Sequence, residues 1–131
     1  MIFVDTGVWY ARYVRSDADH ARARAWFAKV SDRLATTDYV IDKLLTLLRS
    51  RGHGDVALRI GDNLLAGAIC SRVYVEQKDL WRAWTMFSSY RDKEWSFTDC
   101  VSRAVIERLG IATAASFDDH FRQFGNVVVV P

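Results

Sequence analysis

Short apolar runs alternate with longer segments of helical periodicity along the whole chain, and this alternation limits the folds that the chain can adopt. The apolar runs predict five strands, at residues 2–4, 36–40, 72–75, 111–116 and 126–130. Strands separated by helices pair in parallel, and continuously apolar strands are typical of sheets covered on both faces. We therefore predict an α/β fold, a doubly wound parallel sheet of about five strands with helices on both faces.

The intervening segments carry apolar residues at helical spacing, which predicts six helices. The first two span residues 7–15 and 18–31, and the second has Ala21, Ala25, Trp26 and Val30 on one face. The next two contain Leu44, Leu47 and Leu48 before a stop at Gly52, and Val56, Ile60 and Leu64 after a cap at Asp55. The last two contain Trp81, Trp84, Met86 and Phe87, and Val101, Val105 and Leu109 before a stop at Gly110. Glycine suits the left-handed position beyond a helix end.

The length of 131 residues indicates a single domain over residues 1–131, with no repeat or linker. Half of the residues are apolar and the single proline is the last residue, a composition typical of globular proteins. No apolar run approaches the roughly 20 residues of a membrane helix, so we expect no membrane association. The first residues do not resemble a signal peptide, and we expect a cytoplasmic location.

Charge, cysteine and histidine content restrict the chemistry. The formal net charge of +2 does not by itself indicate a nucleic-acid partner, although most basic residues are arginine, which forms forked hydrogen bonds to phosphate. Cys70 and Cys100 have no metal-binding or redox spacing, and we interpret them as small core residues. No two histidines stand at ligand spacing, which disfavours a zinc hydrolase.

Three aspartates stand at positions where a parallel sheet binds ligands. Asp5 ends the first predicted strand, Asp118 ends the fourth, and Asp99 opens the helix before the fourth strand. Ligands bind outside the carboxyl ends of strands, where strand order reverses. If the first and fourth strands are neighbours at that point, Asp5 and Asp118 face each other across one crevice, and Asp99 could reach it. Carboxylates this close would repel one another without a cation, and oxygen ligands favour Mg²⁺ or Mn²⁺. Such a metal site could deprotonate a water and stabilise charge on a phosphodiester.

Each acid also has a purely structural interpretation. Asp5 could cap a helix, Asp99 could form a capping box with Ser96, and Asp118 could belong to a turn or cap. The joint placement of the three acids at strand ends favours the metal site. Of the adjacent pair, we choose Asp118 as the ligand because Asp119 has a capping role available.

Residues 3–6 (FVDT), 96–100 (SFTDC) and 116–121 (SFDDHF) resemble, in order and spacing, the three acidic motifs of PIN domains, and the whole chain looks like the VapC-like toxins. The resemblance implies a Mg²⁺-dependent endoribonuclease whose action on RNA is blocked by a small antitoxin protein, and homodimers are usual in the family. It further implies that Asp5, Asp99 and Asp118 hold the metal, with Thr98 and Thr6 as supporting hydroxyls.

One residue departs from the family pattern. The pattern has a glutamate where this chain has Lys43, and Asp42 is no substitute because neighbouring helical residues point about 100° apart. A lysine removes a carboxylate, repels the ion, and could pair with Asp5 or Asp99 instead. We therefore predict weak Mg²⁺ binding and little or no RNA cleavage. The sequence leaves open whether the lysine is engineered or natural, or is simply a solvated helix residue.

The sequence also allows other interpretations of the protein's function. A catalytically silent PIN-fold protein-binding module is the main alternative, and Lys43 favours it. A phospho-receiver domain would need two adjacent acids after the first strand, and a haloacid-dehalogenase-type phosphatase would need an aspartate where Gly7 stands. We interpret Trp81 and Trp84 as core or interface residues, and consider Trp9 and Tyr10 the better candidates for contact with RNA or antitoxin.

Overall fold

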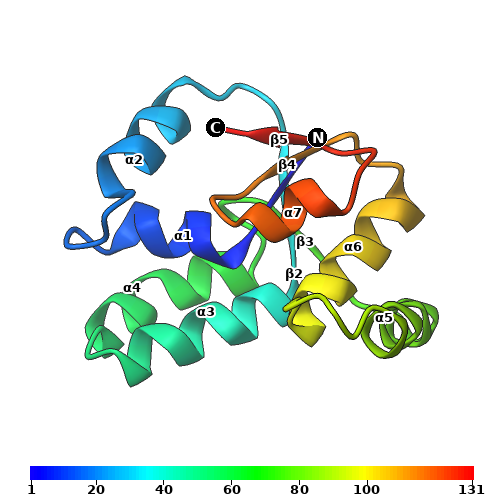
Figure 1. Ribbon diagram of the computed structural model, residues 1–131. Coiled ribbons are helices and arrows are strands. Elements are labelled where there is room, and N and C mark those ends of the chain that lie inside the picture. The colour runs from blue at the N-terminus through cyan, green and yellow to red at the C-terminus, as the bar shows by residue number, and fades with distance from the viewer.

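The computed structural model describes residues 1–131, in which a five-stranded, all-parallel sheet is combined with seven helices (Figure 1). The strands are β1 (Ile2–Val4), β2 (Leu34–Thr37), β3 (Ser71–Val73), β4 (Thr113–Ala115) and β5 (Val128–Val130). The helices are α1 (Thr6–Tyr13), α2 (His20–Lys29), α3 (Asp38–Ser50), α4 (Gly54–Leu65), α5 (Gln77–Ser89), α6 (Phe97–Leu109) and α7 (Asp119–Gln123). The predicted doubly wound α/β fold is confirmed.

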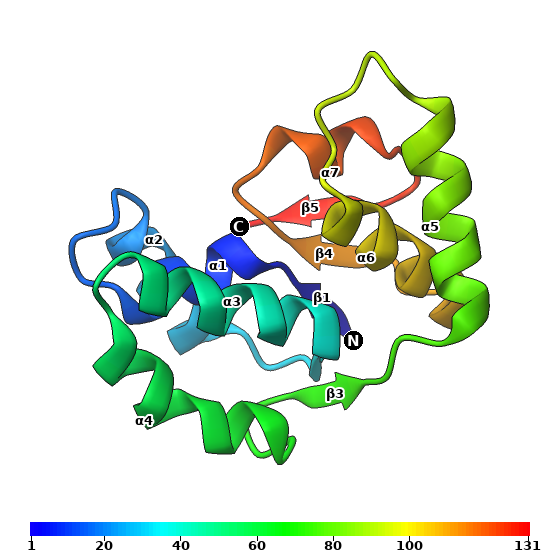
Figure 2. The same ribbon diagram turned by 90° about the horizontal axis from the view of Figure 1, so that it is seen from below.

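The strand order β3-β2-β1-β4-β5 places the reversal of the sheet between β1 and β4. From β1 the chain moves outward through β2 to β3, and it then returns past β1 to β4 and β5. Because crossovers between parallel strands are right-handed, opposite directions of travel place the connecting helices on opposite faces. Accordingly, α1 to α4 lie on one side of the sheet and α5 to α7 on the other (Figure 2).

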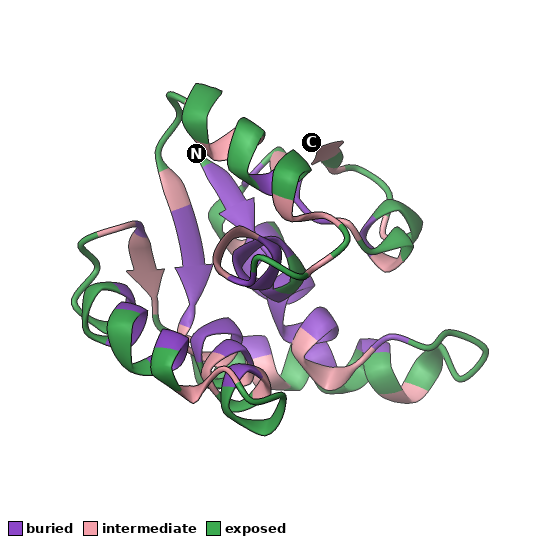
Figure 3. Cartoon of the chain, turned by 90° about the vertical axis from the view of Figure 1, so that its left-hand side faces the viewer, coloured by how far each residue is buried: buried purple, intermediate pink, exposed green.

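The main core lies between the sheet and the helices. Strand β1 is buried at all three positions, which explains why its sequence is apolar throughout. On one side α1 adds Val8 and Trp9, and α3 adds Leu44 and Leu48. Figure 3 shows this pattern, with buried residues in the sheet and exposed residues on the outer sides of the helices.

A second, smaller core lies where α5 packs against α6, and it includes Met86 and Val101. Both cysteines are buried and free, as expected of core residues. Burial raises the pKa of Cys70 and of Cys100 to about 11, so both thiols stay protonated at neutral pH. No helix is long and apolar enough to span a membrane.

The predicted strand at residues 36–40 is wrong in its second half. Strand β2 ends at Thr37, and α3 begins at Asp38. The Thr37 hydroxyl accepts a hydrogen bond from the Val40 amide at 3.1 Å, so Thr37 acts as the N-cap. The β-branched residue Val40 suggested a strand, but the Thr37 cap and the burial of the Val40 side chain place it in the first turn of the helix.

Two smaller predictions about helices also fail, whereas α6 ends at Leu109 and Gly110 takes the left-handed conformation (φ 66°), as predicted. Helix α2 turns Ala23 inward, whereas Ala21 and Ala25 are exposed. His53, not Asp55, stands at the cap position of α4.

Candidate metal centre

The site is built where β1 and β4 pair side by side. Val4 and Ala115 are register partners, and the amide of Asp5 donates a hydrogen bond to the Ala115 carbonyl at 3.0 Å. The chain leaves β1 and β4 toward opposite faces, so a crevice opens at their carboxyl ends. This crevice is a cavity of about 740 Å³ whose lining includes Asp5, Thr6, Lys43, Asp99, Asp118 and His120.

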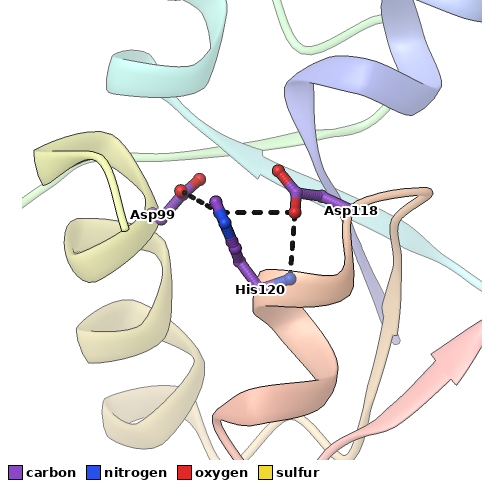
Figure 4. A group of neighbouring side chains, drawn as sticks. All are labelled: Asp99, Asp118 and His120. Atoms are coloured by element: carbon purple, nitrogen blue, oxygen red, sulfur yellow. Dashed lines mark hydrogen bonds and ion pairs between the residues drawn. The ribbon is translucent and has the colours of Figure 1, made fainter. Parts of the chain in front are cut away.

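Asp99, Asp118 and His120 form a cluster in which one ligand atom from each residue lies within 4.8 Å of the others (Figure 4). The Nδ1 atom of His120 lies 3.4 Å from Asp99 Oδ2 and 3.3 Å from Asp118 Oδ1. It is buried and has no hydrogen-bond partner. We did not foresee His120 in this cluster. The available signal was its position two residues after Asp118, inside the same strand-end turn.

Asp99 and Asp118 each combine a helix-capping role with a place in the cavity. Ser96 and Asp99 form the anticipated capping box, with reciprocal bonds of 3.0 Å. The N-cap of α7 is Asp118, whose carboxylate accepts from the His120 amide at 2.9 Å. Our reason for preferring Asp118 as the ligand is therefore wrong, because it was Asp119 that we expected to cap. Capping holds both carboxylates in place beside the cavity.

Asp5 lies in the same cavity but outside this cluster, and only 6% of it is exposed. The Ser116 hydroxyl donates to Asp5 Oδ2 at 3.1 Å and accepts from the Asp118 amide at 3.0 Å, which ties the two strand ends together. Burial, and secondarily the charge of Asp99, raise the pKa of Asp5 to about 6. The Thr6 amide, Ser116 and Lys43 oppose this rise without cancelling it.

Lys43 lines the cavity from α3 and is half-buried, as the family pattern implied, while Asp42 is exposed, as helical geometry predicted. Its positive charge favours the ionised form of Asp5. None of the ion pairs within 4.0 Å includes Lys43, so its ammonium acts on the acids through the cavity rather than by direct contact.

The two predicted supporting hydroxyls occupy different places. Thr6 lines the cavity, and its buried Oγ1 has no hydrogen-bond partner. Thr98 is half-buried in the first turn of α6 and is not among the lining residues. Tyr10 lines the cavity, but Trp9 is buried in the core and cannot contact a partner.

The residues of the cavity fit a divalent cation. Six aspartates line this cavity, Asp5, Asp99 and Asp118 among them, and burial together with the charge of Asp99 raises the pKa of Asp5 to about 6. Two polar atoms, Thr6 Oγ1 and His120 Nδ1, are buried there without partners. Buried polar atoms normally have partners, and a bound cation with its waters would supply them.

Fold and site together define a class: an α/β protein with a carboxylate-lined cavity at the switch point of a parallel sheet. The PIN domain model matches residues 2–127. The chain is 32% identical to the 23S rRNA-specific endonuclease VapC20 of Mycobacterium tuberculosis, over 100% of this chain and 99% of that protein. The chain therefore belongs to the PIN-domain family.

Comparison of structures agrees with this assignment. The crystal structure of Mycobacterium tuberculosis VapC20, described as a Sarcin-Ricin loop cleaving toxin, matches with a TM-score of 0.92 and 29% identity over the full length of both chains. FitAcB from Neisseria gonorrhoeae matches with a TM-score of 0.73 and 16% identity, over 100% of this chain and 97% of that one. At that identity the second match shows the shared fold only.

Proposed function

We propose that this protein is a metal-dependent endoribonuclease toxin of a toxin–antitoxin pair, and that Lys43 weakens its activity. The observation that carries the proposal is the placement of Asp5, Asp99 and Asp118 in one aspartate-lined cavity at the β1/β4 switch point. Full-length similarity to an endonuclease named for 23S rRNA supports the same activity. We therefore propose 23S rRNA, and within it the sarcin–ricin loop, as the substrate to test first.

Asp99 and Asp118 would hold the cation, with His120 as an additional nitrogen ligand. Asp5, which lines the same cavity, would add its negative charge to the site. Carboxylates suit Mg²⁺ or Mn²⁺, and the imidazole favours a transition metal such as Mn²⁺ over Mg²⁺. When bound, the cation would activate water and stabilise charge on the scissile phosphate. Thr6 would fix a water or phosphate oxygen through its unpartnered hydroxyl. Thr98, the residue before Asp99, would support that carboxylate from outside the cavity lining.

Lys43 opposes metal binding by simple electrostatics. It adds a positive charge to a cavity in which the family has a negative one, and that charge repels a divalent cation. Because Lys43 contacts no acid directly, it reduces the negative potential without closing the cavity. We infer that metal binds weakly and that cleavage is slow.

The resemblance to VapC-like toxins further supports a small antitoxin as partner, a homodimer as the assembly and the cytoplasm as the location. Lys43 favours one alternative, a PIN-fold protein that binds its partner without cutting RNA. The two candidates differ in whether a glutamate at position 43 restores cleavage.

The test is cleavage of 23S rRNA in the presence of Mg²⁺ or Mn²⁺ by the unchanged protein, by Lys43→Glu and by Lys43→Glu with Asp99→Asn. Lys29→Glu is the matched control, because Lys29 is exposed and forms no ion pair. Asparagine at position 99 can still accept the capping hydrogen bond, so its effect reports on the charge. We expect Lys43→Glu to cut well and the double variant to cut no better than background. If Lys43→Glu remains inactive on rRNA and on other RNAs, the nuclease proposal is wrong and the binding module becomes the better account.

A further inference from the structure

A second cavity lies at the far end of α1 and is lined by basic and aromatic residues. Its volume is about 550 Å³, and its lining is Arg12, Tyr13, Arg15, His20, Arg24 and Arg59. Arg12 and Tyr13 come from α1, Arg15 from the following loop, His20 and Arg24 from α2, and Arg59 from α4. In Figure 1 α1 lies between α2 and α4, and Figure 3 views the molecule from this side. We call it the arginine cavity.

The four arginines of this cavity are not neutralised by the protein. No acidic residue lines the cavity, and none of its arginines takes part in an ion pair within 4.0 Å. Asp55 and Asp62 stand near Arg59 on α4 at helical spacing, but neither forms an ion pair with it. Four like charges around one concavity repel one another, and a bound anion relieves that repulsion.

The donors suit phosphate. Arginine presents a planar fork of N–H donors that matches phosphate oxygens, and here four forks converge from three helices and a loop. The His20 ring is held in place by a 2.7 Å hydrogen bond that Nδ1 donates to the Ala11 carbonyl. The Arg12 guanidinium lies over the Tyr13 ring at 5.4 Å, which orients it at the cavity wall.

An acidic peptide would be attracted by the same charge, but the cavity offers little to hold one. Only one of its six lining residues is hydrophobic, whereas a docked helix needs an apolar groove for its anchors. A nucleic-acid backbone requires no such groove, because its affinity comes mainly from phosphate contacts.

The arginine cavity and the aspartate-lined cavity at the ends of β1 and β4, which we call the acid cavity, are both lined by residues of α1. Thr6 and Tyr10 of α1 line the acid cavity, and Tyr13 lines the arginine cavity. At 1.5 Å per residue, Thr6 and Tyr13 are separated by about 10 Å along the helix. One strand of duplex DNA advances roughly 3.4 Å per nucleotide along its axis, so a nucleic-acid strand carries successive phosphates over such a separation within a few nucleotides.

We propose that the arginine cavity binds a backbone phosphate of RNA a few nucleotides from the phosphate that enters the acid cavity. This rests on the proposed function for its ligand class, but binding here requires neither metal nor cleavage. The contact is to the backbone, so it contributes affinity and register without sequence preference.

The test is binding of a short fluorescein-labelled RNA stem-loop, followed by anisotropy in EDTA so that no cleavage occurs. The double variant Arg24→Gln/Arg59→Gln removes two lining arginines that are exposed and unpaired. The matched control, Arg33→Gln/Arg91→Gln, removes two exposed arginines that line neither the acid cavity nor the arginine cavity. Thermal unfolding checks that both double variants fold.

We expect the cavity variant to bind RNA about tenfold more weakly or worse, with the slope of log K against log salt reduced by roughly one, and the control to change little. Equal losses in both variants, or no RNA binding by the unchanged protein, would overturn the proposal. It is also overturned if a poly-glutamate peptide, or free adenosine monophosphate, binds as tightly as RNA and depends on the same arginines.

The outcomes separate this proposal from the nuclease proposal. Cavity-dependent RNA binding together with an inactive Lys43→Glu variant would keep the arginine cavity and remove the nuclease. The opposite result has two parts: Lys43→Glu cuts RNA equally well with and without Arg24→Gln/Arg59→Gln, and both double variants lose RNA binding equally. That result would keep the nuclease proposal and remove the arginine cavity.

Discussion

Replacing Asp5 by asparagine should stabilise the metal-free protein at neutral pH. Burial and the charge of Asp99 raise the pKa of Asp5 from its ordinary value of 3.8 to about 6, so the folded protein holds this proton more tightly than the unfolded chain does. Stability therefore falls as pH rises through the window between these two values. A tenfold change in proton affinity is worth about 1.4 kcal/mol, so ionisation of Asp5 costs the fold roughly 3 kcal/mol above pH 7.

Asparagine removes this charge and keeps an acceptor for the Ser116 hydroxyl. Urea unfolding in EDTA should show Asp5→Asn to be more stable by up to about 3 kcal/mol at about pH 7.5, with the difference vanishing near pH 4. Asp62→Asn, at an exposed position of α4, serves as the control and should change little at either pH. Equal or lower stability of Asp5→Asn at neutral pH would refute this account of the buried carboxyl.

Two further predictions concern hydrogen-bonded carboxylates. Burial alone would raise the pKa of Asp79, but the Arg108 fork, with two bonds of 2.9 Å, and the Glu76 amide hold that pKa below its usual value. Arg108→Met should therefore lower the free energy of unfolding by about 2–3 kcal/mol at neutral pH. Urea titrations should show this loss shrinking as pH falls below about 4, because Asp79 then takes up a proton. Ser116→Ala should raise the pKa of Asp5 further, which an NMR titration of the Asp5 carboxyl in EDTA would measure. It should also cost about 1 kcal/mol of stability through the lost hydrogen bonds to Asp5 and Asp118. An unchanged titration midpoint would contradict the role given to Ser116.

The sequence predicted the parts of the site that depend on strand ends. A parallel sheet brings the carboxyl ends of neighbouring strands together, so Asp5 and Asp118 could be placed in one crevice before the structure was known. The resemblance to PIN domains placed position 43 at the crevice, and helical geometry then predicted that Asp42 points elsewhere. These placements follow from the order of strands and helices, from helix periodicity and from the family pattern.

The parts that could not be predicted depend on contacts between distant segments. His120 joins the cluster only because α7 brings its ring between Asp99 and Asp118. The end of β2 was misplaced because Val40 favours a strand by local preference, and the Thr37 cap with the packing of α3 overrides that preference. Trp81 and Trp84, which we assigned to core or interface, are 64% and 51% exposed, which excludes the core and leaves an interface as a prediction.

The arginine cavity shows the same limit. Its arginines are spread over residues 12 to 59, and no local pattern links the end of α1 to the middle of α4. Helix α1 packs against α2 and α3, and α4 packs against α3, which brings these arginines to one concavity (Figure 1).

The central claim is that the carboxylates of the switch-point cavity bind a divalent cation and that Lys43 weakens that binding. Titration with Mn²⁺, followed by the electron paramagnetic resonance signal of the free ion, measures this directly on the unchanged protein, on Lys43→Glu and on Lys43→Glu with Asp99→Asn. We predict that Lys43→Glu binds Mn²⁺ at least about tenfold more tightly than the unchanged protein, because reversing one charge beside a divalent ion is worth more than about 1.4 kcal/mol. We also predict that adding Asp99→Asn removes this gain. Binding by the unchanged protein as tight as that of Lys43→Glu, or a gain that survives Asp99→Asn, would contradict the account.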